Sequence, residues 1–67
     1  MKIGEKISEE RHKAGITGEA LAEKTHVTSG MIYRIESGRV NPSLSLLNEI
    51  AFALGKTLPE LMQEVEL

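Results

Sequence analysis

Apolar residues recur at helical spacing from the start of the chain. Ile3 and Ile7 stand four residues apart in a segment rich in Glu, Lys and Arg, and Gly15 follows that segment. Spacing of this kind on an otherwise charged segment is typical of an amphipathic helix, and glycine commonly ends one. The pattern therefore predicts a first helix over about residues 2–14.

The strongest helical pattern lies between two turn signals in the second half of the chain. The turn and cap Asn41-Pro42-Ser43 precede it, and Gly55 follows it. Its apolar positions, three or one residue apart, are Leu44, Leu47, Ile50, Ala51 and Leu54. This spacing predicts an amphipathic helix that is capped by Ser43 and runs to residue 54.

Threonine residues mark the starts of the other helices. Thr17 can cap a helix over about residues 17–25, and Thr28 can cap one over about residues 28–37. The last helix opens with the capping box Thr57-Leu58-Pro59-Glu60, in which the two end residues each bond the other's backbone. Its predicted apolar face consists of Leu58, Leu61, Met62 and Val65.

No segment alternates apolar and polar residues over the length of a strand, and the chain has neither an internal repeat nor a low-complexity linker. The predicted helices are joined by turns of about 2–6 residues, as is usual in helical domains. The fold class is therefore all-α, a compact bundle of five short helices that forms one domain over residues 1–67.

The second and third predicted helices form a helix-turn-helix. Only a few residues around His26 and Val27 separate them, so they cannot lie antiparallel and must cross steeply. The small side chain of Ala22 lets the two helices approach, and Ile32 and Ile35 turn the later helix onto the core. The opposite face, which is left for solvent or a groove, carries Ser29, Gly30, Tyr33 and Arg34, with Met31 at its edge.

Length and composition narrow the setting. A 67-residue chain has room for one thin core of marginal stability, which a partner subunit would improve. With no cysteine, there is no disulfide or zinc-thiolate cluster, and the cytoplasm is the expected compartment. No apolar run approaches the roughly 18 residues that cross a bilayer, and the N-terminus does not resemble a signal peptide.

The charge distribution is uneven. Residues 1–39 hold seven Lys or Arg against six Glu, a balance of +1, whereas residues 40–67 hold one Lys against four Glu, a balance of −3. The net charge of −2 is not the strongly basic balance typical of nucleic-acid binding. We therefore expect a weak basic face on the first three helices and a modest salt-driven affinity for nucleic acid.

Several motifs occur in register over residues 3–62. They are Gly15-Ile16-Thr17, Glu19-Ala20-Leu21-Ala22, Val27-Thr28, Ile32-Tyr33-Arg34-Ile35-Glu36-Ser37-Gly38, Asn41-Pro42-Ser43-Leu44 and Ile50-Ala51-Phe52-Ala53-Leu54. In their order and spacing they resemble the lambda-repressor-like family, the Cro/CI or XRE type of bacterial and phage regulator. The resemblance implies double-stranded DNA as the partner and a homodimer as the working form.

The resemblance also implies two sets of DNA contacts around the third helix. The residues expected at base edges are Ser29, Gly30, Met31, Tyr33 and Arg34. Those expected at the DNA backbone are Thr17, Gly18, Thr28, Ser37, Arg39 and Asn41. Arg34 is the favoured reader, because its guanidinium can donate two parallel hydrogen bonds to guanine O6 and N7. Arg34 can also be a solvated residue that pairs with a nearby Glu, and Tyr33 can simply cover the edge of its helix.

Departures from the family weaken direct readout. Gly18 replaces a Gln that commonly contacts phosphate, and Gly30 removes a polar reader, so discrimination leans on Arg34 and on DNA shape.

The resemblance further implies a partly buried ion pair between Arg11 and Glu36.

The two histidines do not suggest a metal site. His12 and His26 share no ligand spacing and have no Cys or Asp near them, so neither a metal nor any other cofactor is expected. His26 stands where the family usually has Gly, and we expect it in a left-handed turn conformation, which His tolerates better than most residues.

Two apolar residues lie off the stripe of the Ser43-capped helix. Leu46 and Phe52 are not explained by the core, and a partner subunit would cover them. Since family members dimerise through their C-terminal half, the predicted dimer interface comprises Leu46, Phe52, Leu58, Val65 and Leu67. The plainer alternative is that Phe52 only shields the edge of the core, because single exposed apolar residues are ordinary.

The leading hypothesis is thus a dimeric repressor or autoregulator that inserts its third helix into the major groove of a pseudo-palindromic operator. The alternative keeps the fold without DNA binding, as a protein-interaction module such as an antitoxin or a regulator's partner, and Gly18, Gly30 and the acidic charge favour it. An enzyme is not expected, because no set of nucleophile, base and orienting group is present. For the same reason no small-molecule substrate is expected.

Overall fold

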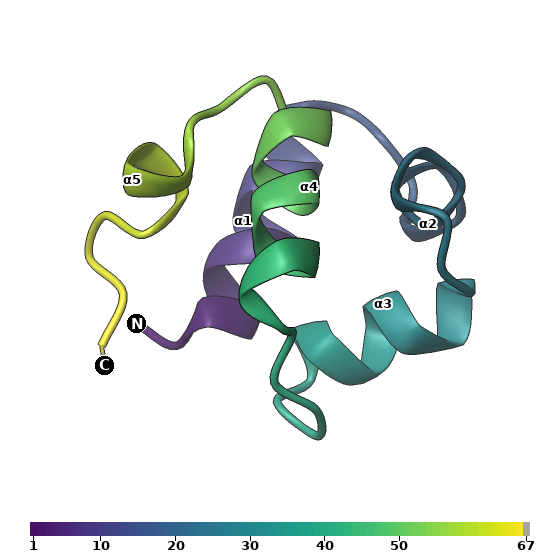
Figure 1. Ribbon diagram of the computed structural model, residues 1–67, viewed down its shortest axis with the longest axis horizontal. Coiled ribbons are helices and arrows are strands. Elements are labelled where there is room, and N and C mark those ends of the chain that lie inside the picture. Colours follow the sequence, from purple (N-terminus) through teal and green to yellow (C-terminus); the bar gives the residue numbers. More distant parts are fainter. Residues whose placement is uncertain (67) are drawn as a thin grey trace.

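A computed structural model describes residues 1–66, which form five helices and no strand. They are α1 (Ile3–Lys13), α2 (Gly18–Thr25), α3 (Ser29–Glu36), α4 (Leu44–Ala53) and α5 (Leu58–Leu61). In Figure 1, α4 stands at the centre in front of α1, with α2 and α3 to one side and α5 to the other. The all-α prediction is confirmed. None of these helices has the length and apolar character needed to span a bilayer.

Hydroxyl caps begin four of the five helices, as predicted. The side chains of Thr17 and Thr28 accept hydrogen bonds from the backbone N–H of Ala20 and Met31, at 3.0 and 3.1 Å. Ser43 caps α4 in the same way. The capping box of α5 is complete, because the Thr57 N–H donates to Glu60 at 2.8 Å and the Glu60 N–H donates to the Thr57 hydroxyl at 3.3 Å. Each cap satisfies a donor that the helix cannot pair internally.

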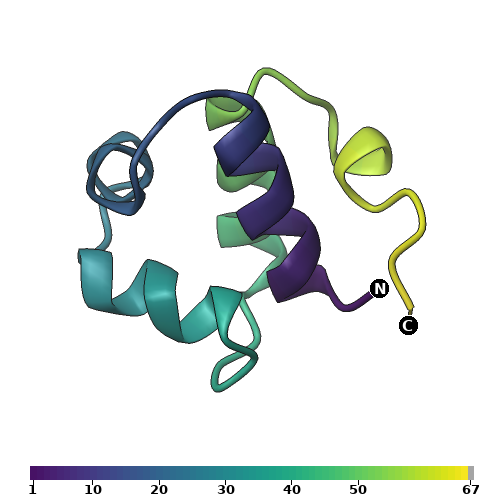
Figure 2. The same cartoon turned by 180° about the vertical axis from the view of Figure 1, so that it is seen from behind.

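The last helix is shorter than its apolar spacing predicted. It ends at Leu61, and Glu64 has a left-handed φ of 65°, so Val65 is not on a helix. The chain turns back there, and the Glu66 N–H donates to the carbonyl of Met1 at 2.8 Å. The two ends of the described chain therefore lie together, as Figures 1 and 2 show. The Glu66 N–H thus pairs with Met1 and does not extend the helical hydrogen bonds of α5, which is only one turn long.

One buried cluster holds the helices together, and it draws on all of them. Its members are Ile7, Leu21, Ala22, Ile32, Ile35, Leu47, Ile50, Ala51 and Leu61. Helix α2 packs on α3 and α4, α1 packs on α3 and α5, and α4 packs on α5. Leu44 was predicted to lie on the apolar stripe of α4, but its side chain is 71% exposed. The prediction was wrong because Leu44 is the first residue of α4, beyond the end of the core.

A network of charges ties α1 to the turn before α5. The buried carboxylate of Glu10 lies 3.3 Å from the Lys56 ammonium, with Lys13 at 3.5 Å and Lys6 at 3.8 Å. Burial alone would raise the pKa of Glu10, but its contacts with Lys56 and the two other lysines outweigh burial and lower that pKa. Since the pKa is lowered on folding, the cluster stabilises the fold at neutral pH and loses that effect as acid protonates Glu10.

Gly4 allows α1 to approach the end of α3. It is buried, and a Cβ atom there would overlap the carbonyl oxygen of Ile35 and lie 2.8 Å from that of Glu36. These are backbone atoms, which cannot rotate away as a side chain can. The contact between α1 and α3 therefore depends on glycine at this position.

Replacing Gly4 with alanine should lower the free energy of unfolding by about 1–3 kcal/mol or more, because the helices must move apart. The matched control is Gly30→Ala, at the equivalent second position of α3, where a Cβ would meet nothing closer than 3.8 Å. There the higher helix propensity of alanine should be neutral or stabilise by about 0.5–1 kcal/mol. Urea denaturation measures both, and equal effects of the two substitutions would contradict the close approach.

Candidate nucleic-acid interface

The turn between α2 and α3 fixes the angle between the two helices. His26 ends α2 in the left-handed conformation, with φ at 60°, as predicted from its position. The next residue, Val27, is half-buried against the core, and its N–H donates to the carbonyl of Ala22 at 3.1 Å. The structure thus has the steep crossing of a helix-turn-helix, with α3 at an edge of the molecule (Figure 1).

The outer side of α3, here called the recognition face, consists of Ser29, Gly30, Tyr33, Arg34 and Ser37. Arg34 is exposed, and one of its guanidinium nitrogens lies 3.8 Å from the place that a Cβ of Gly30 would occupy. The side chain therefore extends back one turn toward the start of the helix. Gly30 leaves that space open for Arg34. Met31, in contrast, is half-buried and packs against the core.

Tyr33 lies against the start of α2. A Cβ on Gly18 would sit 2.7 Å from the Tyr33 ring, and Gly18 is buried although Thr17 and Glu19 on either side of it are exposed. The Tyr33 hydroxyl donates to the Glu19 carboxylate at 3.1 Å. That hydrogen bond, and to a lesser degree burial, raises the pKa of Tyr33, so the hydroxyl stays protonated and acts as the donor. The side chain is 44% exposed, so the ring covers Gly18 and still faces solvent.

The residues predicted at the DNA backbone surround the recognition face. Thr17 and Thr28 are exposed at the starts of α2 and α3, where their oxygens act as caps. The Ser37 hydroxyl donates to the carbonyl of Arg34 at 3.1 Å. Arg39 and Asn41 are exposed in the segment between α3 and α4. Gly18 differs from these residues, since it lies beneath Tyr33 and offers no side chain.

Arg11 and Glu36 form a bidentate ion pair between α1 and the last residue of α3. Two guanidinium nitrogens of Arg11 lie 2.7 and 3.0 Å from the two carboxylate oxygens, and a third donates to the carbonyl of Ile16 at 3.0 Å. Both side chains are nearly buried. The hydrogen bond to Glu36 raises the pKa of Arg11, against the effect of burial. The pair ties the C-terminal end of α3 to α1.

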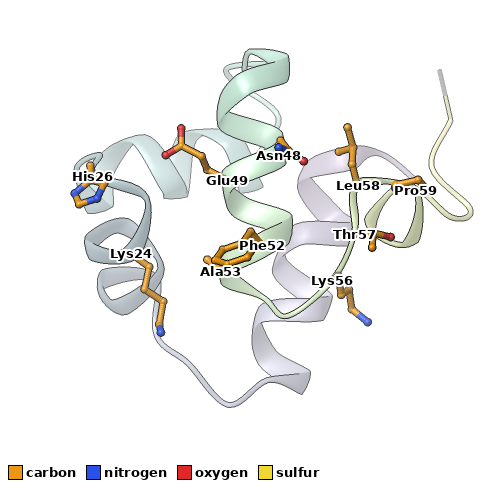
Figure 3. A pocket seen from close by; sticks show the side chains of 10 residues that line it. All are labelled: Lys24, His26, Asn48, Glu49, Phe52, Ala53, Lys56, Thr57, Leu58 and Pro59. Atoms are coloured by element: carbon orange, nitrogen blue, oxygen red, sulfur yellow. The ribbon is translucent and has the colours of Figure 1, made fainter.

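Two of the residues predicted at a dimer interface line one groove. Phe52 is 85% exposed on α4, and Phe52 and Leu58 both line a groove of about 800 Å³ (Figure 3). The other lining residues are Lys24, His26, Asn48, Glu49, Ala53, Lys56, Thr57 and Pro59. Leu46 and Val65 are half-buried and do not line this Phe52 groove. Leu67 lies outside the described residues.

The histidines do not come together with other ligand groups. His12 contacts the Ser8 carbonyl at 2.7 Å, whereas His26 lines the Phe52 groove. Within residues 1–66, no group of three or more His, Cys, Asp or Glu side chains is placed to hold a metal ion.

Comparisons with known proteins agree with the helix-turn-helix geometry described above. A family model described as helix-turn-helix matches residues 7–61. The chain belongs to this helix-turn-helix family of DNA-binding transcription regulators. An HTH-type transcriptional regulator of Methanothermobacter thermautotrophicus is 48% identical over 50 residues, which cover 75% of this chain and 72% of that protein.

Two repressors extend the comparison. The immunity repressor protein of Bacillus phage phi105 is 40% identical over 55 residues, which cover 82% of this chain but only 38% of the repressor. The DNA-binding domain of the P22 C2 repressor has the same fold, with a TM-score of 0.90 at 25% identity over 96% of this chain and 84% of that domain. The resemblance to lambda-type repressors is confirmed.

Sequence reasoning did not anticipate two features of this helix-turn-helix domain. Gly18 was interpreted as the loss of a phosphate contact, but the structure shows the Tyr33 ring lying over it. Glu19 was not singled out as a site residue, although it accepts a hydrogen bond from the recognition face. The signal that was available was the combination of a small residue with a large aromatic one, but no sequence spacing pairs positions on two crossing helices.

Proposed function

We propose that the protein represses transcription as a homodimer that binds a pseudo-palindromic site in double-stranded DNA. Each copy places α3 in the major groove, and the two copies of α3 lie about one DNA turn, roughly 34 Å, apart. Occupancy of the operator then blocks polymerase, and the repressors among the similar proteins support this mode of action. The protein works in the cytoplasm, without catalytic activity or a small-molecule substrate.

The observation that carries the proposal is the exposed Arg34 on the recognition face. Its guanidinium lies over Gly30, toward the end of α3 that enters the groove first. There it can donate two parallel hydrogen bonds to guanine O6 and N7. Ser29 offers a hydroxyl at base edges and the exposed part of the Tyr33 ring lies on the same face, while the part of the half-buried Met31 that stays exposed can contact a thymine methyl group.

Backbone contacts position α3 in this proposal. The first turns of α2 and α3 carry unpaired N–H groups and the exposed hydroxyls of Thr17 and Thr28, and both suit phosphate oxygens. Arg39 and Asn41 reach the backbone from the segment that follows α3, and Ser37 lies at the end of the recognition face. Gly18 contributes its backbone N–H alone. These contacts set the register of the protein on the duplex.

The Phe52 groove supplies the homodimer interface. Phe52 is the most exposed large apolar side chain described, and Leu58 lines the same groove. A two-fold axis through this surface pairs each Phe52 with the groove of the other copy, so that the same residues meet from both sides. Glu49 lies in the groove with Lys24 and Lys56, so opposite charges are available across the axis.

Substitution of Arg34 tests base recognition. An operator is first selected from a library of random duplexes by binding to the wild-type protein. Arg34→Ala should then lose about 1–3 kcal/mol of discrimination at one base pair, because the lost hydrogen bonds are specific to guanine. Circular dichroism should show unchanged helix content, since the side chain is exposed.

Arg39→Ala is the matched control. It should weaken binding to all sequences alike and reduce the slope of log affinity against log salt by about 1, as the loss of one phosphate contact does. If Arg34→Ala behaved in the same uniform way, Arg34 would be a phosphate contact rather than a base reader.

A protein-interaction module is the second candidate. The acidic net charge and the two glycines near the recognition face favour it. The selection separates the two functions, because a folded wild-type protein that enriches no sequence and retains no duplex at low salt would leave only protein interaction.

A further inference from the structure

Glu19 places a carboxylate beside the surface that faces DNA in the proposed function. It is the second residue of α2, and its carboxylate accepts the hydroxyl of Tyr33, a member of the recognition face. In helix-turn-helix complexes the first helix of the pair crosses the DNA backbone while the second enters the groove. A carboxylate at this junction therefore faces phosphates.

One hydrogen bond, from the Tyr33 hydroxyl, holds this carboxylate beside the recognition face. An exposed Glu side chain gains little from a single partner and normally turns into water. Here, however, the Tyr33 ring is seated on Gly18, and its hydroxyl donates to the Glu19 carboxylate at 3.1 Å. The ring and the hydroxyl together hold the negative charge at the interface.

Few positive charges on this surface offset that negative one. The exposed cations on α3 and the segment after it are Arg34 and Arg39, and the whole chain carries a net charge of −2. Since phosphate attraction supplies most of the sequence-independent affinity for DNA, a carboxylate near these two guanidinium groups offsets part of that attraction.

We infer that Glu19, positioned by Tyr33, weakens DNA binding by electrostatic repulsion of the phosphates. It lowers the affinity for duplexes of every sequence and so raises the protein concentration at which the operator is occupied. Tyr33 is a positioning residue, because its hydrogen bond holds the Glu19 carboxylate toward the phosphates. The inference rests on the proposed placement of α3 in the major groove.

The test compares Glu19→Gln with Glu23→Gln. Both variants remove one negative charge from exposed positions on α2, one turn apart, and glutamine at position 19 can still accept the Tyr33 hydroxyl. Binding to a random-sequence duplex is measured by fluorescence anisotropy at several salt concentrations. Glu19→Gln should tighten binding about fivefold at low salt, as expected for removing one like charge at close range. The gain should shrink as salt screens it.

Glu23→Gln should change the affinity much less than Glu19→Gln does. Equal effects of the two variants would overturn the inference, because the gain would then reflect net charge alone. A folded wild-type protein that binds no duplex at all would instead refute the proposed function. The two failures are therefore distinguishable.

Tyr33→Phe tests the positioning role. It keeps the ring over Gly18 but frees the Glu19 carboxylate to turn away, so binding should tighten by less than in Glu19→Gln. Unchanged or weaker binding in Tyr33→Phe would overturn this role, and weaker binding would show that the hydroxyl itself contacts DNA. In the Glu19→Gln background, Tyr33→Phe should have no further effect, because no fixed charge remains to be released.

Discussion

Replacing Arg11 with methionine is expected to lower the free energy of unfolding by about 3–5 kcal/mol, the usual cost of removing one partner from a buried ion pair. Methionine keeps much of the aliphatic stem but leaves Glu36 as a buried carboxylate without its two hydrogen bonds. The carbonyl of Ile16 loses a donor as well. In a domain of this size, a loss of that order removes much of the total stability. Urea denaturation followed by circular dichroism measures it.

A second substitution separates the effect of the two charges from the effect of side-chain packing. Adding Glu36→Leu to Arg11→Met removes both charges, and such apolar replacements of buried pairs are often neutral or stabilising. The double variant should therefore recover most of the lost stability. Lys24→Met, which removes an exposed cation on α2, should change stability little. A cost in Lys24→Met equal to that in Arg11→Met would show that the loss of any positive charge, and not of the pair, is responsible.

The helices and their order could be predicted because local signals agree with the tertiary fold. Thr17, Thr28, Ser43 and Thr57 each cap the helix that the sequence assigned to them. Such caps act within four residues, so the sequence contains all that determines them. The steep crossing of α2 and α3 was predictable for the same reason, since the short connection leaves no antiparallel alternative.

The contacts between helices were less predictable, because they depend on crossing angles that no local pattern encodes. Gly4 gave no signal as an approach point, although a Cβ there would lie within 2.8 Å of two carbonyl oxygens of α3. The Tyr33 ring over Gly18 likewise joins positions 15 residues apart on different helices. The end of α5 was overestimated because apolar spacing cannot show that Glu66 pairs with Met1 instead.

The residues of the candidate site were likewise predictable only in part. Its exposed residues could be assigned from the face of α3 opposite the core, which helical periodicity defines. The sequence could not show which of these residues are exposed. In the structure Arg34 is exposed, whereas Met31 packs against the core. The dimer surface is similar, since Phe52 and Leu58 line one groove but Leu46 and Val65 do not.

Phe52→Asp is expected to raise the dissociation constant of the homodimer by at least about 30-fold, the effect of losing a 2 kcal/mol hot spot. Under the proposed two-fold arrangement both copies lose an aromatic ring, and two carboxylates face the Phe52 groove beside Glu49. The monomer should keep its stability, because the Phe52 side chain is 85% exposed and contributes little to the core. Sedimentation velocity over a range of concentrations, without DNA, measures the dimer, and thermal unfolding of the dilute protein measures the monomer.

Leu44→Asp is the matched control for Phe52→Asp. It makes the same change from an exposed apolar side chain to a carboxylate on the same helix, but at the N-terminal end of α4 and outside the Phe52 groove. A carboxylate in the first turn of a helix is also favourable to the helix dipole, so the fold should tolerate it. Dimerisation should be unaffected in Leu44→Asp and lost in Phe52→Asp. The reverse pattern would move the two-fold axis to the other end of α4, beside the segment that precedes it.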